Sequence, residues 1–249
     1  SKPPSPLLSE AMQHYLQLKG IGKAKTFQQA AIRNTKVVTD ILGDRVLTEY
    51  RSVDAGRVRD ELLARNLSVL SIRRIFTTVK AIINLSITEH GLDIRNPFSQ
   101  IYLPDGESKK RVSIPVDTIR EIQQACYQHD DDIRWLIALI SDTGMRLAEA
   151  AGLNINDLHL DDEIPYVDIK PHPWRPLKTK GSQRQIPLVG ASLWAAQRIK
   201  ANATSDYAFP RYTNHDRSNA NSASNGLNKW LQSNFREDIV IHGFRHALR

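Results

Sequence analysis

The stretch SVLSIRRIFTTVKAIINLSITEH, residues 68–90, decides the fold of the first part of the chain. Its apolar residues recur at the three- and four-residue spacing of a helix and form one continuous stripe: Ile72, Ile75, Phe76, Val79, Ile82 and Ile83. Gly91 is placed to end this helix, and Asn96-Pro97 prevents its continuation. The spacing therefore predicts a long helix with one face buried.

The opposite face of the same helix is polar and carries Arg73, Thr77 and Lys80. Such a face is most often simply solvated, although its spacing also suits contacts along a phosphate backbone. The residues alone leave both interpretations open.

Three further helical patterns precede this helix, over residues 7–19, 26–42 and 53–63. The stretch LPDGESKKRVSIP, residues 103–115, combines Pro, Gly and Ser with a basic run and almost no apolar content, as a linker does. We therefore predict a helical domain over 1–105, a basic linker over 106–115, and a second domain over 116–249.

The second domain is predicted to be mostly helical with a small antiparallel β-sheet. Two short strands, 164–170 and 183–188, are joined by a loop rich in Pro and Lys, PHPWRPLKTKGS. In front of them, Thr143 is the expected N-cap of a helix that Gly152 ends. Residues 211–225 are polar and predict a loop, and the expected helices span 116–128, 131–141, 191–201 and 225–234. The fold class is thus mainly α.

The charge and cysteine content of the sequence limit the classes of function that it can have. The net charge is +7, and the 105 residues before the linker hold 15 Lys and Arg against 10 Asp and Glu. A basic surplus suits a polyanionic partner. The single Cys126 excludes a disulfide framework and a cysteine-rich zinc site, and it fits a reducing compartment. No apolar run is long enough to span a membrane, so we expect a cytoplasmic protein.

Three short clusters carry candidate chemistry: Arg146 in TGMRLAE, Lys178 and Lys180 in LKTKGSQRQIPL, and the segment HGFRH at 242–246. Singly, each is ambiguous, because a helical Arg usually pairs with an acid and lysine is common in turns. His242 and His246 have the spacing of a zinc pair. However, the Glu of a metalloprotease motif is replaced by Gly243, and a third ligand is not evident.

Together the three clusters describe an anion site without a metal. Two guanidiniums can hold the non-bridging oxygens of a phosphodiester and neutralise charge during in-line displacement. A Lys ammonium can protonate a departing alkoxide, and a His can assist proton transfer. No cofactor and no metal ligand set is expected.

The three boxes, in this order and at this separation, resemble the signature boxes of the tyrosine recombinases, the phage-integrase family. The resemblance covers the second domain, and the helical first domain is similar to that family's core-binding domain. It implies that Arg146 and Arg245 are the catalytic arginines and His242 the histidine of the His-x-x-Arg box. Lys178 is the favoured catalytic lysine, with Lys180 the alternative. Glu149, three residues after Arg146, is expected to orient its guanidinium.

In this family a tyrosine attacks the scissile phosphate and forms a 3′-phosphotyrosyl link, without ATP or a metal. All seven tyrosines of the sequence precede His242, so none occupies the expected place of the nucleophile. We therefore expect a C-terminally incomplete chain that binds DNA and does not cleave it.

The resemblance implies a site-specific recombinase encoded by a bacterium or a phage, associated with the nucleoid. The expected partners are double-stranded DNA attachment sites and three further copies of the chain, in a tetramer on paired sites. The expected DNA contacts are Arg73, Thr77, Lys80, Lys109, Lys110, Arg111, Lys180 and Arg184.

Three alternatives remain open on the sequence. A type IB topoisomerase or a resolvase uses the same constellation to relax or resolve DNA. A DNA-binding regulator without catalysis would need only the basic surface. A metal-dependent nuclease would require divalent ions for cleavage.

Overall fold

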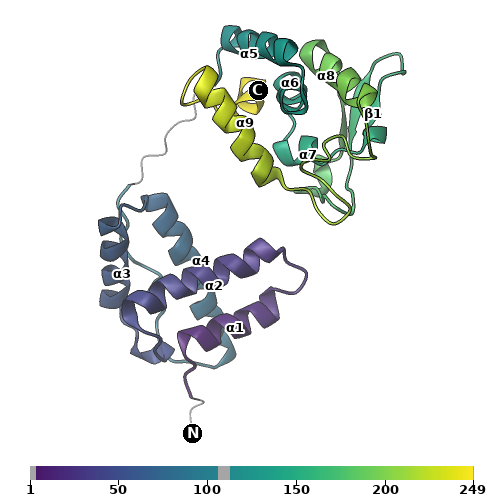
Figure 1. Ribbon diagram of the computed structural model, residues 1–249. Coiled ribbons are helices and arrows are strands. Elements are labelled where there is room, and N and C mark those ends of the chain that lie inside the picture. The colour runs from purple at the N-terminus through teal and green to yellow at the C-terminus, as the bar shows by residue number, and fades with distance from the viewer. Residues whose placement is uncertain (1–3, 106–112, 249) are drawn as a thin grey trace. The chain divides into compact units, whose positions relative to one another are not determined.

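The computed structural model describes residues 4–105 and 113–248, and the chain divides into two compact units, Ser1–Lys109 and Lys110–Arg249 (Figure 1). Most of the predicted linker lies outside the described residues, including Lys109, Lys110 and Arg111. Within the described ranges, no helix is both long enough and apolar enough to cross a bilayer.

The first unit is built from helices: α1 (Leu8–Lys19), α2 (Lys25–Leu42), the short 3-10 turn η1 (Leu47–Glu49), α3 (Ser52–Ala64) and α4 (Val69–Glu89). The long helix predicted over 68–90 is therefore confirmed as α4. It begins where the Ser68 hydroxyl accepts a hydrogen bond from the Ser71 amide, which satisfies one of the free donors of the first turn. Gly91 follows the end of α4 with φ of 57°, a conformation that favours glycine.

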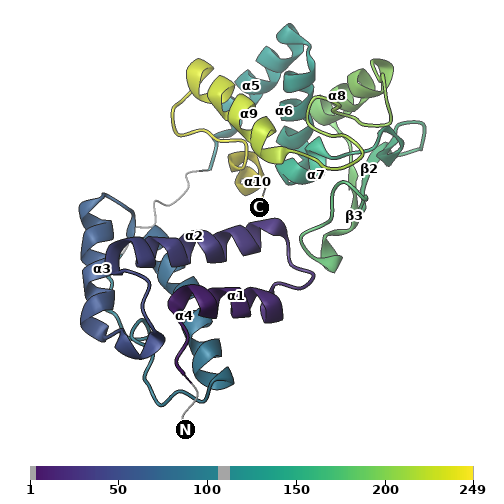
Figure 2. The same ribbon diagram turned by 60° about the horizontal axis from the view of Figure 1, so that its bottom comes forward.

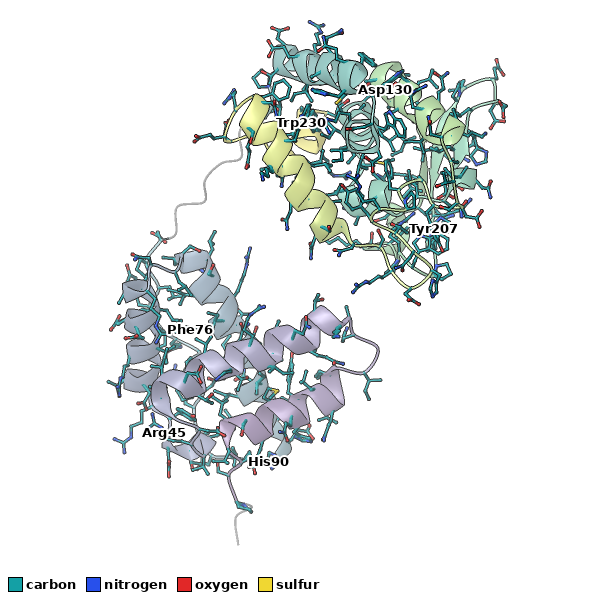
Figure 3. All side chains as sticks on the ribbon, viewed as in Figure 1. Arg45, Phe76, His90, Asp130, Tyr207 and Trp230 are labelled. Carbon is teal, nitrogen blue, oxygen red and sulfur yellow. The ribbon has the colours of Figure 1, made fainter. Side chains whose placement is uncertain are left out.

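The core of the first unit forms around α4. All six residues of its apolar stripe are buried, and Phe76 lies among the helices of this unit, edge-on to Phe98 at 5.3 Å between ring centroids (Figure 3). The chain after α4 is tied back to it by Asn96. The Asn96 side-chain amide donates to the Lys80 carbonyl oxygen at 3.0 Å and to Asn84 Oδ1. This buried polar group is therefore hydrogen-bonded, as burial requires.

The second unit contains the remaining helices: α5 (Val116–His129), α6 (Asp132–Thr143), α7 (Leu147–Ala151), α8 (Gly190–Ala201), α9 (Ala220–Asn234) and α10 (Gly243–Ala247). Helix α6 is buried on every side over residues 136–140 and packs against α5 and α8. A helix that is apolar all round is a central one, so the helices around α6 bury their inner faces on it.

A three-stranded antiparallel sheet lies beside these helices, in the order β1 (Leu158–His159), β2 (Tyr166–Ile169), β3 (Arg184–Pro187). Strands β2 and β3 run side by side with Val167 opposite Ile186 (Figure 2). The predicted fold class, mainly α with a small antiparallel sheet, is confirmed. Strand β1 was not predicted, because two residues are too short to show an alternating pattern.

Two local predictions were wrong. Thr143 is the last residue of α6 rather than an N-cap, and its hydroxyl donates back to the Leu139 carbonyl oxygen. Residues 211–225 are not all loop, because α9 already begins at Ala220. The Asn219 side chain caps this helix, and Ala223, Leu227 and Leu231 bury one face at four-residue spacing. Tertiary packing overrides the low helix propensity of the Asn- and Ser-rich first turns.

Candidate active site

The turn between α6 and α7 positions Arg146. Gly144 ends α6 with φ of 58°, a left-handed conformation that favours glycine, and α7 begins three residues later. Met145 is buried and anchors the turn, and Arg146 stands immediately before the first residue of α7. The Arg146 amide donates to Glu149 Oε2 at 2.9 Å, and its Nη1 donates to Oε1 at 2.7 Å. The first turn of α7 thus fixes the guanidinium.

Glu149 is a buried carboxylate with its side chain only 4% exposed, and it binds a second guanidinium as well. Arg184, at the start of β3, places Nη2 2.9 Å from Oε2 and Nη1 3.4 Å from Oε1. Burial by itself raises the pKa of Glu149. The hydrogen bonds from Arg184 and from the backbone and side chain of Arg146 outweigh burial and hold the pKa below its usual value. Glu149 is therefore ionised and links α7 to β3.

Ser182 joins the two arginines to the hairpin turn that follows Lys178. Its hydroxyl oxygen is 3.4 Å from Arg146 Nη1, and its carbonyl oxygen accepts from Arg184 Nη1 at 2.7 Å. The Ser182 and Thr179 hydroxyls lie 2.9 Å apart. The polar hydroxyls of the turn are therefore directed at the Arg146 side of the unit.

The two candidate lysines flank Thr179. Lys178 is exposed and makes no hydrogen bond or ion pair with any described residue. The side chain of Lys180 lies outside what the structure describes. The assignment of the catalytic lysine to Lys178, with Lys180 as the alternative, stays a prediction.

Helix α10 brings Arg245 to the same turn. Arg245 Nη1 donates to the Gly144 carbonyl oxygen at 2.7 Å, two residues before Arg146 in the chain. A Cβ at Gly144 would lie 3.1 Å from Leu248 Cδ1 and 3.8 Å from the Arg245 Cα, so the backbone of α10 approaches this glycine closely. Figure 2 shows α10 next to the helices that pack around α6.

His242 is the residue directly before α10, so the contacts that hold the start of this helix also position His242. A side chain at Gly243 would collide with Ile114, so the glycine allows the turn to pack against the start of the unit. The Asn228 side chain accepts from the Ile241 amide at 2.8 Å, which ties the segment to α9. The rings of His242 and His246 meet edge to face at 4.9 Å. Across residues 4–105 and 113–248, no group of three His, Cys, Asp or Glu side chains is arranged to hold a metal ion.

The structure therefore gathers Arg146, Glu149, Arg184 and Arg245 around one turn, although the segments that carry them are far apart in the sequence. Ser182 also belongs to this network and was missed, since a serine in a polar hairpin carries no distinctive sequence signal. Arg73, Thr77 and Lys80 lie elsewhere, on α4 of the first unit. Arg73 and Thr77 are exposed and Lys80 is half-buried. Their predicted contact with DNA is not tested by this placement.

The guanidiniums of Arg146 and Arg245 both lie at the turn before α7, and together they suit a singly or doubly negative oxyanion. Both hydrogen bonds from the Arg146 side chain to described residues use Nη1, which leaves Nε and Nη2 to bind an anion. Guanidinium forks bind the paired oxygens of a phosphate in this way.

Residues 113–249 match the model of the phage integrase family, so the chain belongs to the phage integrase family. The resemblance of its three sequence boxes to this family is thereby confirmed. Comparison with curated protein sequences gives no match.

Solved integrase structures share the fold across both units. The Tn1549 transposon integrase in complex with circular intermediate DNA is 17% identical, with a TM-score of 0.76, over 98% of this chain and 85% of that one. A lambda integrase dimer bound to a core site is 16% identical, with a TM-score of 0.73, over 98% and 69%. A lambda integrase tetramer bound to a Holliday junction is 15% identical, with a TM-score of 0.74, over 98% of this chain and 72% of that one.

Proposed function

We propose that the protein is a site-specific DNA recombinase that cleaves and rejoins DNA through a 3′-phosphotyrosyl intermediate. The observation that carries this proposal is the hydrogen bond from Arg245 to the Gly144 carbonyl oxygen. It puts the arginine of the His-x-x-Arg box beside the turn that holds Arg146. Membership of the phage integrase family supports the same assignment.

Each residue then has a role in one displacement at phosphorus. Arg146 and Arg245 bind the two non-bridging oxygens and stabilise the charge that builds up in the transition state. A tyrosine hydroxyl passes its proton to His242 as its oxygen forms a bond to phosphorus, while the bond to the 5′ oxygen breaks. Lys178 donates a proton to that leaving oxygen, and His242 assists proton transfer. The reverse reaction, with a 5′ hydroxyl as nucleophile, rejoins the strand.

The proposed substrate is double-stranded DNA at an attachment site, and the proposed active assembly is a tetramer on two such sites. The Tn1549 integrase structure contains circular intermediate DNA, and lambda integrase forms a dimer on a core site and a tetramer on a Holliday junction. We extend these partners to this protein on the basis of the shared fold and family.

The test is a suicide substrate whose nicked strand traps the covalent adduct, incubated with the full-length gene product. We expect a protein–DNA adduct for the wild type and its loss in Arg146→Ala and Arg245→Ala. Arg198→Ala is the matched control, because it removes an Arg–carboxylate pair, with Asp130, from α8. An unchanged adduct yield in both active-site variants contradicts the proposal. Relaxation of DNA without exchange between two sites favours the topoisomerase alternative.

A further inference from the structure

We propose that Arg184 is a positioning residue that holds Arg146 and the lysine-bearing hairpin in one arrangement, through Glu149 and Ser182, and that it is not a contact to DNA. This replaces its predicted role as a phosphate contact. The inference deepens the proposed function and rests on it.

The first observation is that Glu149 is saturated with hydrogen-bond donors. An ionised carboxylate has about four lone-pair positions for hydrogen bonds. Oε1 faces Nη1 of both Arg146 and Arg184, and Oε2 faces the Arg146 amide and Arg184 Nη2. Removing one guanidinium leaves a buried carboxylate underpaired, which is costly in a low-dielectric environment. Glu149 then has to shift toward the remaining donors, and it takes Arg146 with it.

The second observation is that both terminal nitrogens of Arg184 donate to protein groups, so no terminal nitrogen is left wholly to an anion. Nη1 donates to the Ser182 carbonyl oxygen at 2.7 Å and also faces Glu149, and Nη2 donates to Glu149. Arg146 differs, because its contacts to described residues leave Nε and Nη2 for an anion. The two arginines are exposed to a similar degree, 33% for the Arg146 side chain and 30% for Arg184, so hydrogen bonding and not exposure separates their roles.

The third observation is the path from Arg184 to the lysine. Arg184 holds the Ser182 carbonyl, the Ser182 hydroxyl lies 2.9 Å from the Thr179 hydroxyl, and Thr179 follows Lys178 directly. The Ser182 hydroxyl also reaches Arg146 Nη1. Arg184 thus fixes both the Arg146 guanidinium, which binds the phosphate, and the turn that positions Lys178, the general acid. A misplacement of about 1 Å between such groups can lower a rate roughly 100-fold.

The experiment compares Arg184→Ala and Arg184→Lys with Arg198→Ala as the matched control. Two quantities are measured on the full-length gene product: the dissociation constant for duplex DNA over a range of salt, and the single-turnover rate of adduct formation at saturating DNA. We expect Arg184→Ala to lower the saturated rate about 10- to 100-fold with little change in affinity or salt slope. Arg184→Lys keeps the positive charge but loses the forked pair of donors, so its rate should lie between those of the wild type and Arg184→Ala. Arg198→Ala should match the wild type.

A double-mutant cycle with Glu149→Gln tests the path itself. If Arg184 acts through Glu149, its removal in the Glu149→Gln background should cost less than in the wild type. Additive losses overturn the proposal. It is also overturned by an unchanged saturated rate, or by weaker binding with a salt slope reduced by about 0.9, which is the change expected when one phosphate is no longer neutralised.

Amide hydrogen exchange of residues 178–184 gives a readout that does not require cleavage. Arg184→Ala should increase exchange there under conditions in which the second unit stays folded, and unchanged exchange overturns the proposal. If Arg184→Ala unfolds the second unit, the single-turnover rate and the amide exchange are measured on Arg184→Lys instead. Failure of the proposed function is distinguishable, because then the wild type and Arg146→Ala both lack the adduct while the exchange result still stands.

Discussion

Arg245 and Gly144 are joined by a hydrogen bond of 2.7 Å between the Arg245 Nη1 and the Gly144 carbonyl oxygen, although 101 residues separate them. The bond fixes α10 to the end of α6, where the left-handed conformation of Gly144 opens the backbone toward the guanidinium. The geometry of the site therefore depends on one glycine as much as on its charged residues.

Gly144→Ala is expected to destabilise the second unit and to displace Arg245. An alanine in the left-handed region costs about 1–2 kcal/mol, and the new Cβ also meets Leu248 at 3.1 Å. All four tryptophans lie in the second unit, so urea denaturation followed by tryptophan fluorescence reports this loss. Gly91→Ala, with φ of 57° and open space at its Cβ, is the control and should show the backbone cost alone. Because Gly91 lies in the first unit, which has no tryptophan, its unfolding is followed by far-UV circular dichroism. Equal losses for both variants contradict the crowding at α10.

Glu149 should make the stability of the second unit depend on pH. Its folded pKa lies below the usual value of 4.5, so the unfolded state binds a proton at higher pH than the folded state does. The stabilisation is present above the unfolded pKa and is lost as pH falls through the folded pKa. Denaturation midpoints measured from pH 7 to pH 3 should fall more steeply for the wild type than for Glu149→Gln. Parallel curves would show that Glu149 has no depressed pKa.

The lysine assignment predicts a chemical rescue. Lys178→Ala should slow cleavage of an ordinary phosphodiester at least about 100-fold, because a general acid contributes that much to expulsion of an alkoxide. A substrate with sulfur at the 5′ bridging position leaves as a thiolate and needs no proton, so cleavage should recover. Lys180→Ala should cleave both substrates at close to the wild-type rate. Rescue of Lys180→Ala in place of Lys178→Ala would reverse the assignment.

The polar face of α4 can be tested by charge reversal. If Arg73 and Lys80 bind phosphates, Arg73→Glu and Lys80→Glu should each weaken duplex binding and reduce the slope of log K against log salt by about 0.9, because one phosphate is then no longer neutralised. Arg65→Glu, on an arginine paired with Glu61 after α3, is the control for net charge. A slope that does not change would return this face to the role of a solvated surface.

Cys126 should be inert while the second unit is folded. Burial raises the pKa of this thiol to about 12, so almost no thiolate is present near neutral pH. A thiol reagent at pH 8 should label the protein only as fast as the unit opens, and labelling should accelerate with urea. Fast labelling in native buffer would mean that α5 is not packed as described.

The sequence predicted the long elements and the clusters that carry the charged residues of the candidate site, and it missed what depends on tertiary contacts. The apolar stripe of α4 repeats over three turns, so its period is unambiguous. Strand β1 has two residues, and α9 starts in an Asn- and Ser-rich segment that favours loops by composition. Both form because neighbouring elements supply the partners. Stabilisation by distant elements cannot be predicted from the local sequence.

The same limit applies to the site. Glu149 is the third residue of α7 and Arg146 the residue before the helix, so their contact follows from the geometry of a helix start. Arg184 lies 35 residues from Glu149, and only the register of β3 brings it there. From the sequence it was one more basic residue in a hairpin, and the DNA contact was the natural interpretation. Spatial convergence is the information that a linear pattern lacks.

The bond between α10 and Gly144 also sets an order in time. A chain is synthesised from its N-terminus, so α6 and the hairpin have already been synthesised when residue 245 is added. The second guanidinium is therefore the last part of the anion site to arrive. A chain terminated before residue 245 therefore carries Arg146 and its partners without the second guanidinium of the candidate site.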